Sequence, residues 1–393
     1  MNDRMQLSRT VWALGFVSLF MDISSEMIHS LLPIFMVTQL GVSALVLGTI
    51  EGVAEAITLF MKTFSGALSD WLRKRKLLIV WGYLLAALTK PLFAFSHHLS
   101  WIIVARFTDR MGKGIRGAPR DALIADVTPP LLRGTAFGLR QSLDTWGAVI
   151  GPLLAMLGMF VFADNFHAVF MFAIIPALLS VFILMIFVKE PKTAPITEPV
   201  VWPLRKAVLK NLPRNYWWVF GLGFVFTLAR FSEAFLILRA QTLGLALTYV
   251  PMVLLFMSVF YAASAYPFGK ISDKVGRMRL FVLSLLLLIL ANVVLALSSE
   301  VWTVFIGVAL WGLHLGASQG VLSALIADTS PAHLRATAFG LFSLSSGVAT
   351  LLASIIAGLL WVSLGAAATF IVGGIFALIT LFILGVYQHV RTS

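Results

Sequence analysis

Long apolar stretches separated by short polar connections fill almost the whole chain. Each stretch is close to or above the ~20 residues that a helix needs to cross a bilayer. The pattern therefore predicts an all-α membrane protein with 12 transmembrane helices. The predicted helices lie near residues 11–37, 45–68, 77–95, 101–124, 135–162, 168–187, 217–238, 249–271, 280–297, 301–326, 337–362 and 366–386.

Composition agrees with a membrane protein and excludes several chemistries. The 393 residues are 60% hydrophobic and only 12% charged, so a soluble fold would leave much apolar surface in water. The first stretch, 11–37, is too long and too charged in its middle for a cleaved signal peptide, and we expect it to stay in the chain. The sequence has no cysteine, which excludes disulfides and thiolate metal sites. We expect no cofactor.

The basic residues gather on one side of the predicted membrane. With both termini in the cytoplasm, the inside loops and tails hold nineteen Lys and Arg residues and seven acids, whereas the outside loops hold the acids Asp164 and Glu300. This positive-inside bias sets the orientation. It also accounts for the net charge of +12, so we expect no nucleic-acid partner.

One long connection, residues 189–214, interrupts the series of short loops at the middle of the chain. It carries prolines at four-residue intervals, and proline removes helix donors and stiffens an extended chain. We therefore predict an N-terminal six-helix bundle at 1–188, a cytoplasmic linker at 189–214 and a C-terminal six-helix bundle at 215–393.

An internal repeat supports this division. Gly66-Ala-Leu-Ser-Asp70 recurs as Gly269-Lys-Ile-Ser-Asp273 after 203 residues, and the Ala-Leu-Ile-Ala-Asp segment at 122–126 recurs at 324–328 after 202. Because the recurrences keep their order and nearly one offset, the two halves are predicted to be parallel six-helix repeats.

Several of these segments resemble signatures of the major facilitator superfamily. Residues 66–75 and 269–279 resemble its G-x-L-x-D-R-x-G-R-K loop motif, 106–112 its conserved-arginine motif, and 147–152 the G-x-x-x-G-P motif of its antiporters. The resemblance covers almost the whole chain. It implies the major facilitator fold, 12 helices in two six-helix pseudo-repeats, and a secondary transporter that rocks its halves around a central cavity.

The motif residues have expected mechanical roles. In the two loop motifs glycine permits a tight turn, and aspartate can bond helix amides or an arginine of the other half. We interpret these residues as a conformational latch: Gly66, Asp70, Gly269 and Asp273. In the fifth predicted helix Gly147 and Gly151 allow close helix approach, and Pro152 allows a bend.

Ionisable residues inside the apolar stretches are the strongest functional signal. The predicted spans contain eighteen, fifteen of them in the first half. An isolated charge at the bilayer centre costs ~2.5–3.5 kcal/mol, so such groups pair or face a wet cavity. In the first predicted helix Asp22, Glu26 and His29 share one face. Two carboxylates one turn apart resist simultaneous ionisation, as a site that loads and releases a proton requires; in the other interpretation they form ion pairs that only stabilise the bundle.

The remaining candidates follow from the same argument. Glu55 ranks above Glu51, which we expect near the hydrated outer mouth, and the resemblance links Arg106 to proton coupling. The full set for proton coupling and the substrate cavity is Asp22, Glu26, His29, Glu55, Arg106, Asp109, Arg110, Arg140, Asp144, Arg230 and Glu233.

These features favour proton-coupled efflux of a small molecule across the cell inner (plasma) membrane, with substrate, protons and lipid bilayer as partners and a monomer as the unit. One alternative is a permease for an anionic organic compound or metal chelate, siderophore- or citrate-like, bound by the Arg-rich helices. Another is a divalent metal exporter using Asp22, Glu26 and His29. No Gly-rich loop ending in Gly-Lys-Ser/Thr occurs, so we expect no ATP hydrolysis and no enzyme.

Overall fold

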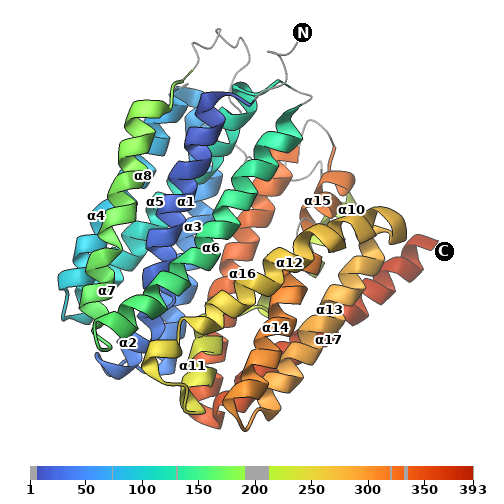
Figure 1. Ribbon diagram of the computed structural model, residues 1–393. Coiled ribbons are helices and arrows are strands. Elements are labelled where there is room, and N and C mark those ends of the chain that lie inside the picture. The colour runs from blue at the N-terminus through green and yellow to red at the C-terminus, as the bar shows by residue number, and fades with distance from the viewer. Residues whose placement is uncertain are drawn as a thin grey trace. The chain divides into compact units, whose positions relative to one another are not determined.

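The structure, a computed structural model, describes residues 7–72, 74–129, 132–190, 212–318, 321–331 and 335–392, and within them the chain is helical, without strands (Figure 1). The first half contains α1 (Arg9–His29), α2 (Leu32–Thr38), α3 (Ala44–Leu72), α4 (Arg75–Phe95), α5 (Leu99–Asp126), α6 (Arg133–Val161), α7 (Phe166–Phe172) and α8 (Ile174–Phe187). The second contains α10 (Arg214–Leu228), α11 (Ala234–Thr242), α12 (Met252–Val275), α13 (Arg277–Leu297), α14 (Val301–Ser318), α15 (Val321–Thr329), α16 (Arg335–Leu364) and α17 (Ala366–Thr392). A short 3-10 turn, η2, covers Leu247–Tyr249.

Ten stretches among the described residues are long and apolar enough to cross a membrane. The stretch Arg9–Thr38 joins α1 and α2, which are separated at Ser30 and Leu31, just before Pro33. Proline lacks the amide that would continue the helix hydrogen bonds, which explains the interruption. The chain is thus a multi-pass helical membrane protein, while the number of twelve spans stays a prediction.

Two predicted spans are not among the ten, for different reasons. Helix α5 has 28 residues, about 42 Å at 1.5 Å per residue, so its length is sufficient and its many charges set it apart. The predicted helix 217–238 was wrong as a continuous element, because the chain breaks it between Leu228 and Ala234. Ser232 explains the break: its Oγ accepts from Ala234 N, and its own amide donates to Ser354 Oγ at 3.3 Å. Serine competes in this way with helix hydrogen bonds.

The chain divides into two compact units. The first unit contains Met1–Phe35 and Ile57–Val201, and the second contains Met36–Ala56 and Trp202–Ser393. The linker residues 191–211 lie outside the described part of the chain. In this division the segment Met36–Ala56, which includes the first half of α3, belongs to the second unit.

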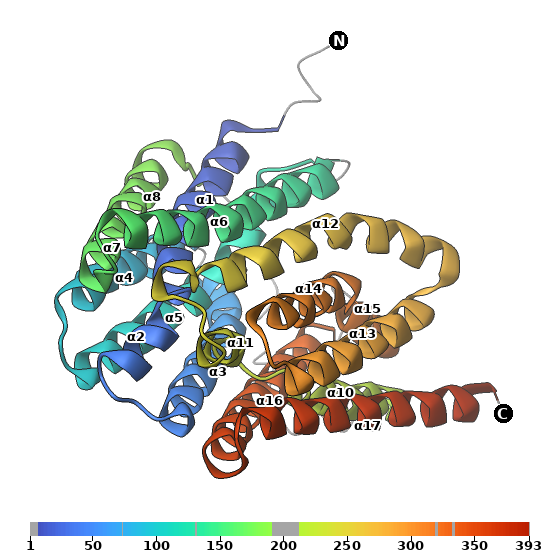
Figure 2. The same cartoon turned by 60° about the horizontal axis from the view of Figure 1, so that its bottom comes forward.

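Close helix packing holds the first unit together. Helix α1 lies between α8 and α6, and α4 packs along α5 (Figures 1 and 2). Val11, Leu14, Val17 and Met21 of α1 are buried against a core that includes Tyr83 of α4. Serines also tie the helices: Ser24 Oγ donates to Ala173 O at 2.6 Å and Ser180 Oγ to Val17 O at 2.8 Å. Such bonds replace the water that a bilayer does not supply.

In the second unit α13 packs against α14 and α17, and α10 against α16 and α17 (Figure 2). The first half of α3 joins this unit through glycine. A Cβ at Gly48 would collide with Ser354 O, and one at Gly52 would lie 3.1 Å from Leu351 Cα. Small residues are needed there because the backbones of α3 and α16 nearly touch.

Candidate functional site

The polar face of α1 is where predicted coupling residues meet neighbouring helices. Glu26 Oε2 lies 3.4 Å from His29 Nδ1, so these two side chains satisfy each other along the helix. Asp22 is different, because within the part of the chain that the structure describes its carboxylate makes no hydrogen bond or ion pair. Its charge is influenced from a distance: Asp144 repels it, and Lys113, Arg116 and Arg120 attract it.

Two glycines of α6 support this face of α1. A Cβ at Gly147 would lie 2.8 Å from Cβ of Asp22 and 3.0 Å from Leu19 O. A Cβ at Gly151 would lie 2.6 Å from Cβ of Glu26. The G-x-x-x-G pair therefore lies directly beside the two carboxylates, a relation that the sequence analysis did not predict. Pro152 follows inside α6, which runs as one helix from Arg133 to Val161.

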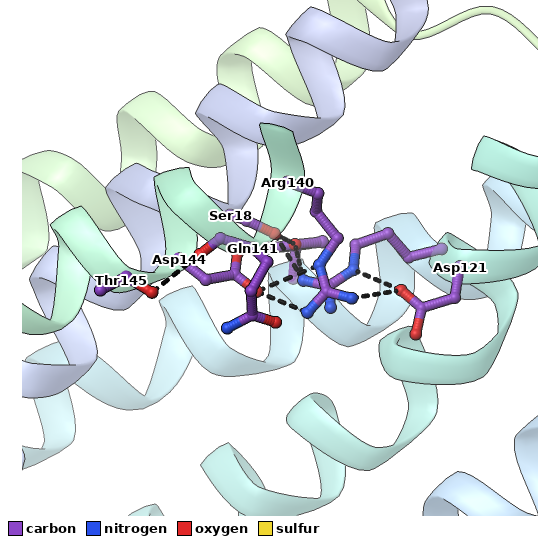
Figure 3. Close-up of polar contacts among 8 residues, drawn as sticks. Ser18, Asp121, Arg140, Gln141, Asp144 and Thr145 are labelled. Carbon is purple, nitrogen blue, oxygen red and sulfur yellow. Dashed lines mark hydrogen bonds and ion pairs between the residues drawn. The ribbon is translucent and has the colours of Figure 1, made fainter. Parts of the chain in front are cut away.

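Arg140 joins two acids from different helices. Its Nε and Nη2 donate to Asp144 Oδ2 at 3.1 and 2.5 Å, and its Nη1 donates to Asp121 Oδ1 at 3.0 Å (Figure 3). Both bonds to Asp144 end on one carboxylate oxygen, and charge-assisted bonds of this kind are stronger than those between neutral groups. Asp144 Oδ1 has no hydrogen bond with a described residue. Arg140 and Asp144, both predicted, thus meet through the local i, i+4 spacing, and α5 adds Asp121.

Arg120 is held mainly by neutral hydroxyls. Its Nη1 donates to Ser18 Oγ at 2.5 Å and to Tyr83 OH at 3.4 Å, while its Nε lies 3.4 Å from Asp121 Oδ1. Ser18 and Tyr83 also bond each other at 3.0 Å. Arg116 stacks on the same tyrosine, with Cζ 4.4 Å from the ring centroid. The sequence did not single out Ser18 and Tyr83, because the candidates were chosen by charge and neither side chain is charged at neutral pH.

Lys90 and Asp109 form a buried ion pair. Lys90 Nζ donates to Asp109 Oδ1 at 2.8 Å and to Ser25 Oγ at 3.1 Å, and the two charged side chains are 1% and 7% exposed. Asp109 was a predicted site residue, but Lys90 was only counted among the charges. Its position before Pro91, far from the two basic residues that begin the helix, was the available signal. Arg106 and Arg110, the other predicted residues of α5, are buried as well.

The two acids of α3 differ in exposure. Glu51 is 1% exposed, so the expectation that water covers its side chain was wrong. Glu55, one turn further along, is half-buried. The adjacent Gly52 packs on α16, which explains why water does not cover this part of α3.

Two predicted residues of the second unit lie at the break between α10 and α11. Arg230 follows the end of α10, with its Cζ 5.4 Å from the ring centroid of Phe226. Glu233 is the residue before α11. Both are half-buried. Unwound segments inside transporter helices commonly carry substrate or ion contacts.

The predicted latch is only partly visible. Gly66 lies in α3, where a Cβ would come to 3.4 Å from Ala118 Cβ, an ordinary contact. The side chains of Asp70 and Asp273, and the surroundings of Gly269, lie outside what the structure describes. Arg75, at the end of the first motif, pairs with Asp126 at 2.9 Å. The latch stays a prediction.

The described residues contain no group of three His, Asp or Glu side chains that would hold a metal ion. Asp22, Glu26 and His29 share a face of α1 without forming such a cluster. The arrangement is instead a chain of acids, bases and hydroxyls that links four helices of the first unit.

Apolar helices long enough to span a bilayer, with buried charges between the helices of the first unit, define a polytopic membrane protein. The Major Facilitator Superfamily model matches residues 14–256 and 219–392, and the chain belongs to this family. An uncharacterized MFS-type transporter of Methanocaldococcus jannaschii is 34% identical over 385 residues, 96% of this chain and 94% of the relative. The protein is therefore a transporter and not an enzyme.

More distant relatives widen the comparison. The quinolone resistance protein NorA of Staphylococcus aureus is 21% identical over 307 residues, 76% of each chain. The crystal structure of a POT family transporter in complex with a thioalcohol-conjugated peptide matches with a TM-score of 0.82 at 16% identity, covering 98% of this chain and 97% of the other. This likeness concerns the fold.

Proposed function

We propose that the protein is a proton-coupled exporter of a small molecule that works by alternating access, with Asp22 as the proton-binding carboxylate. The observation that carries the proposal is the contrast among the acids of the first unit. Glu26, Asp109, Asp121 and Asp144 each have a basic partner. Asp22 has none among the described residues, so a proton is the simplest means of neutralising it in a bilayer.

Export agrees with the name of one relative. NorA is named for quinolone resistance, a trait that export of the compound would produce. We further propose that this chain acts as a monomer in the cell inner (plasma) membrane, with both termini in the cytoplasm, following the positive-inside distribution of its loops. Its two six-helix halves then alternate access around a central cavity.

The proposal is tested with purified protein in sealed vesicles under an imposed pH gradient. The panel contains cationic, neutral and anionic compounds, including a quinolone, with and without divalent metal. The expected result is proton-driven movement of cationic or neutral compounds that Asp22→Asn abolishes and Glu300→Gln preserves. Glu300 is a suitable control because it is an acid outside the spans. Full proton-driven transport by Asp22→Asn would contradict the proposal.

An anionic substrate is the second candidate. Arg116 is 4% exposed, and its Nη1 makes no hydrogen bond with any residue that the structure describes. A carboxylate or phosphate group would satisfy such a nitrogen, as in an organic acid or a metal chelate. In the same assay, movement of anions alone, lost in Arg116→Gln, would favour this function over the first.

A further inference from the structure

Asp22 and Arg120 lie one step apart in the same network without being paired. Ser18 stands four residues before Asp22 on α1, so the two side chains are neighbours on one helix face. Arg120 Nη1 reaches Ser18 Oγ at 2.5 Å. The guanidinium is thus anchored one helical turn from the carboxylate.

The hydrogen-bond partners of Arg120 are mostly uncharged. Ser18 and Tyr83 are neutral hydroxyls, and the contact of Arg120 Nε with Asp121 Oδ1 is long, at 3.4 Å. Asp121 is already engaged by Arg140 at 3.0 Å. An ionised carboxylate binds arginine more strongly than a hydroxyl does. A negative charge on Asp22 would therefore compete for Arg120.

We propose that Arg120 is the exchangeable counter-ion of Asp22: the hydroxyls of Ser18 and Tyr83 hold it while Asp22 carries a proton, and it moves to Asp22 when that proton leaves. Protonation of Asp22 breaks the Arg120–Asp22 pair and restores the hydroxyl contacts, and no other group changes its charge. Proton binding on α1 is thereby converted into a rearrangement between α1, α4 and α5. The inference rests on the proposed role of Asp22.

The charged surroundings of Asp22 allow this assignment. From α6, Asp144 faces it, and Asp144 is held by Arg140. From α5, Lys113, Arg116 and Arg120 act on it.

The other ionisable groups near Asp22 are already paired. Along α1, Glu26 pairs with His29, and Lys90 of α4 pairs with Asp109. Helix α8 carries no ionisable residue, and His167 of α7 lies 2.9 Å from Ala94 O through its Nδ1. Lys113 exerts the largest of the attractions on Asp22, but its side chain is exposed. Arg120 is the cation that its hydrogen bond with Ser18 holds one helical turn from Asp22.

The test is infrared difference spectroscopy of the full-length protein in lipid vesicles, titrated with pH and without added substrate. The carbonyl stretch of a protonated carboxylic acid that disappears in Asp22→Asn reports the proton on Asp22. Arg120→Gln is expected to raise the midpoint of this band by about one pH unit, a tenfold gain in proton affinity, because the carboxylate loses its counter-ion. Arg9→Gln, the same change at an exposed position of α1, is the matched control and should leave the midpoint unchanged.

The hydroxyl variants separate partner exchange from a general loss of charge. Ser18→Ala and Tyr83→Phe release Arg120, so each should lower the midpoint, opposite to Arg120→Gln. If Arg120→Gln fails to fold, Arg120→Lys and these two variants decide the question, with the lysine variant remaining within half a unit of wild type. A midpoint that stays constant or rises in both hydroxyl variants would overturn the inference. Absence of any titrating band that depends on Asp22 would instead overturn the proposed function.

Discussion

The residues that carry charge inside the first unit differ in their partners, and the partners indicate what each does. Lys90 and Asp109 are almost fully buried and bonded to each other and to Ser25. A pair of this kind stabilises the packing only while both members are present. Asp22 has no such partner in the described part of the chain. We therefore assign a structural role to the first pair and propose proton binding for Asp22.

Removing one member of the Lys90–Asp109 pair should destabilise the protein. Asp109→Leu leaves an ammonium group buried without its carboxylate, which costs about 3–5 kcal/mol. The double variant Lys90→Met, Asp109→Leu removes both charges and should recover most of that loss. Thermal unfolding in detergent measures both. A double variant that unfolds as early as Asp109→Leu alone would show that the pair does not act as a unit.

Helix periodicity predicted part of this site and missed another part. The i, i+4 spacing placed Asp22 with Glu26 and Arg140 with Asp144 correctly on shared faces, because such spacing is a property of one helix. Contacts such as Arg120 with Ser18, or Gly147 beside Asp22, join helices far apart in sequence. No single-helix pattern contains that information.

At the scale of elements, the approach of α1 to α6 depends on glycine. Gly147→Leu would place a side chain where Cβ of Asp22 lies 2.8 Å away, so the helices must separate. Overpacking of this kind costs about 1–3 kcal/mol, and it moves the proton site. We expect a lower unfolding temperature and reduced proton-driven transport.

Gly138→Leu provides the control for this variant. Gly138 lies on the same helix, and among the described residues no atom outside its own helix backbone lies within 4 Å of the position of its Cβ. This substitution should leave both stability and transport near wild type. Equal effects of the two leucine variants would mean that the Gly147 contact has no special role.

The break between α10 and α11 shows why hydropathy alone predicted a continuous span there. Apolar residues continue through 217–238, so the average hydropathy does not fall sharply. The interruption comes from Ser232 and from Ser354 of α16, which bonds the freed amide. A pattern of apolar residues cannot report a hydrogen bond from another helix.

At the scale of the whole molecule, the distribution of basic loops predicts the orientation in the membrane. Because the chain has no cysteine, single cysteines can report sidedness without background. Lys189→Cys should react with a membrane-impermeant maleimide only when the reagent can reach the cytoplasmic face of the membrane. Glu300→Cys should react in intact cells. The opposite labelling pattern would reverse the proposed topology.

The all-helical membrane class was predictable from the sequence, because an apolar stretch long enough to span a bilayer is a local property of the chain. The grouping of Met36–Ala56 with the second unit was not, since it depends on the fit of Gly48 and Gly52 against α16.

The most direct test of the account compares two transport modes of Asp22→Asn in sealed vesicles, using a compound that the wild-type protein moves under a pH gradient. Exchange of labelled for unlabelled compound needs alternating access but no net proton movement, whereas uphill accumulation needs both. The account predicts that Asp22→Asn retains exchange and loses accumulation driven by the pH gradient. Accumulation at the wild-type level in this variant would contradict it.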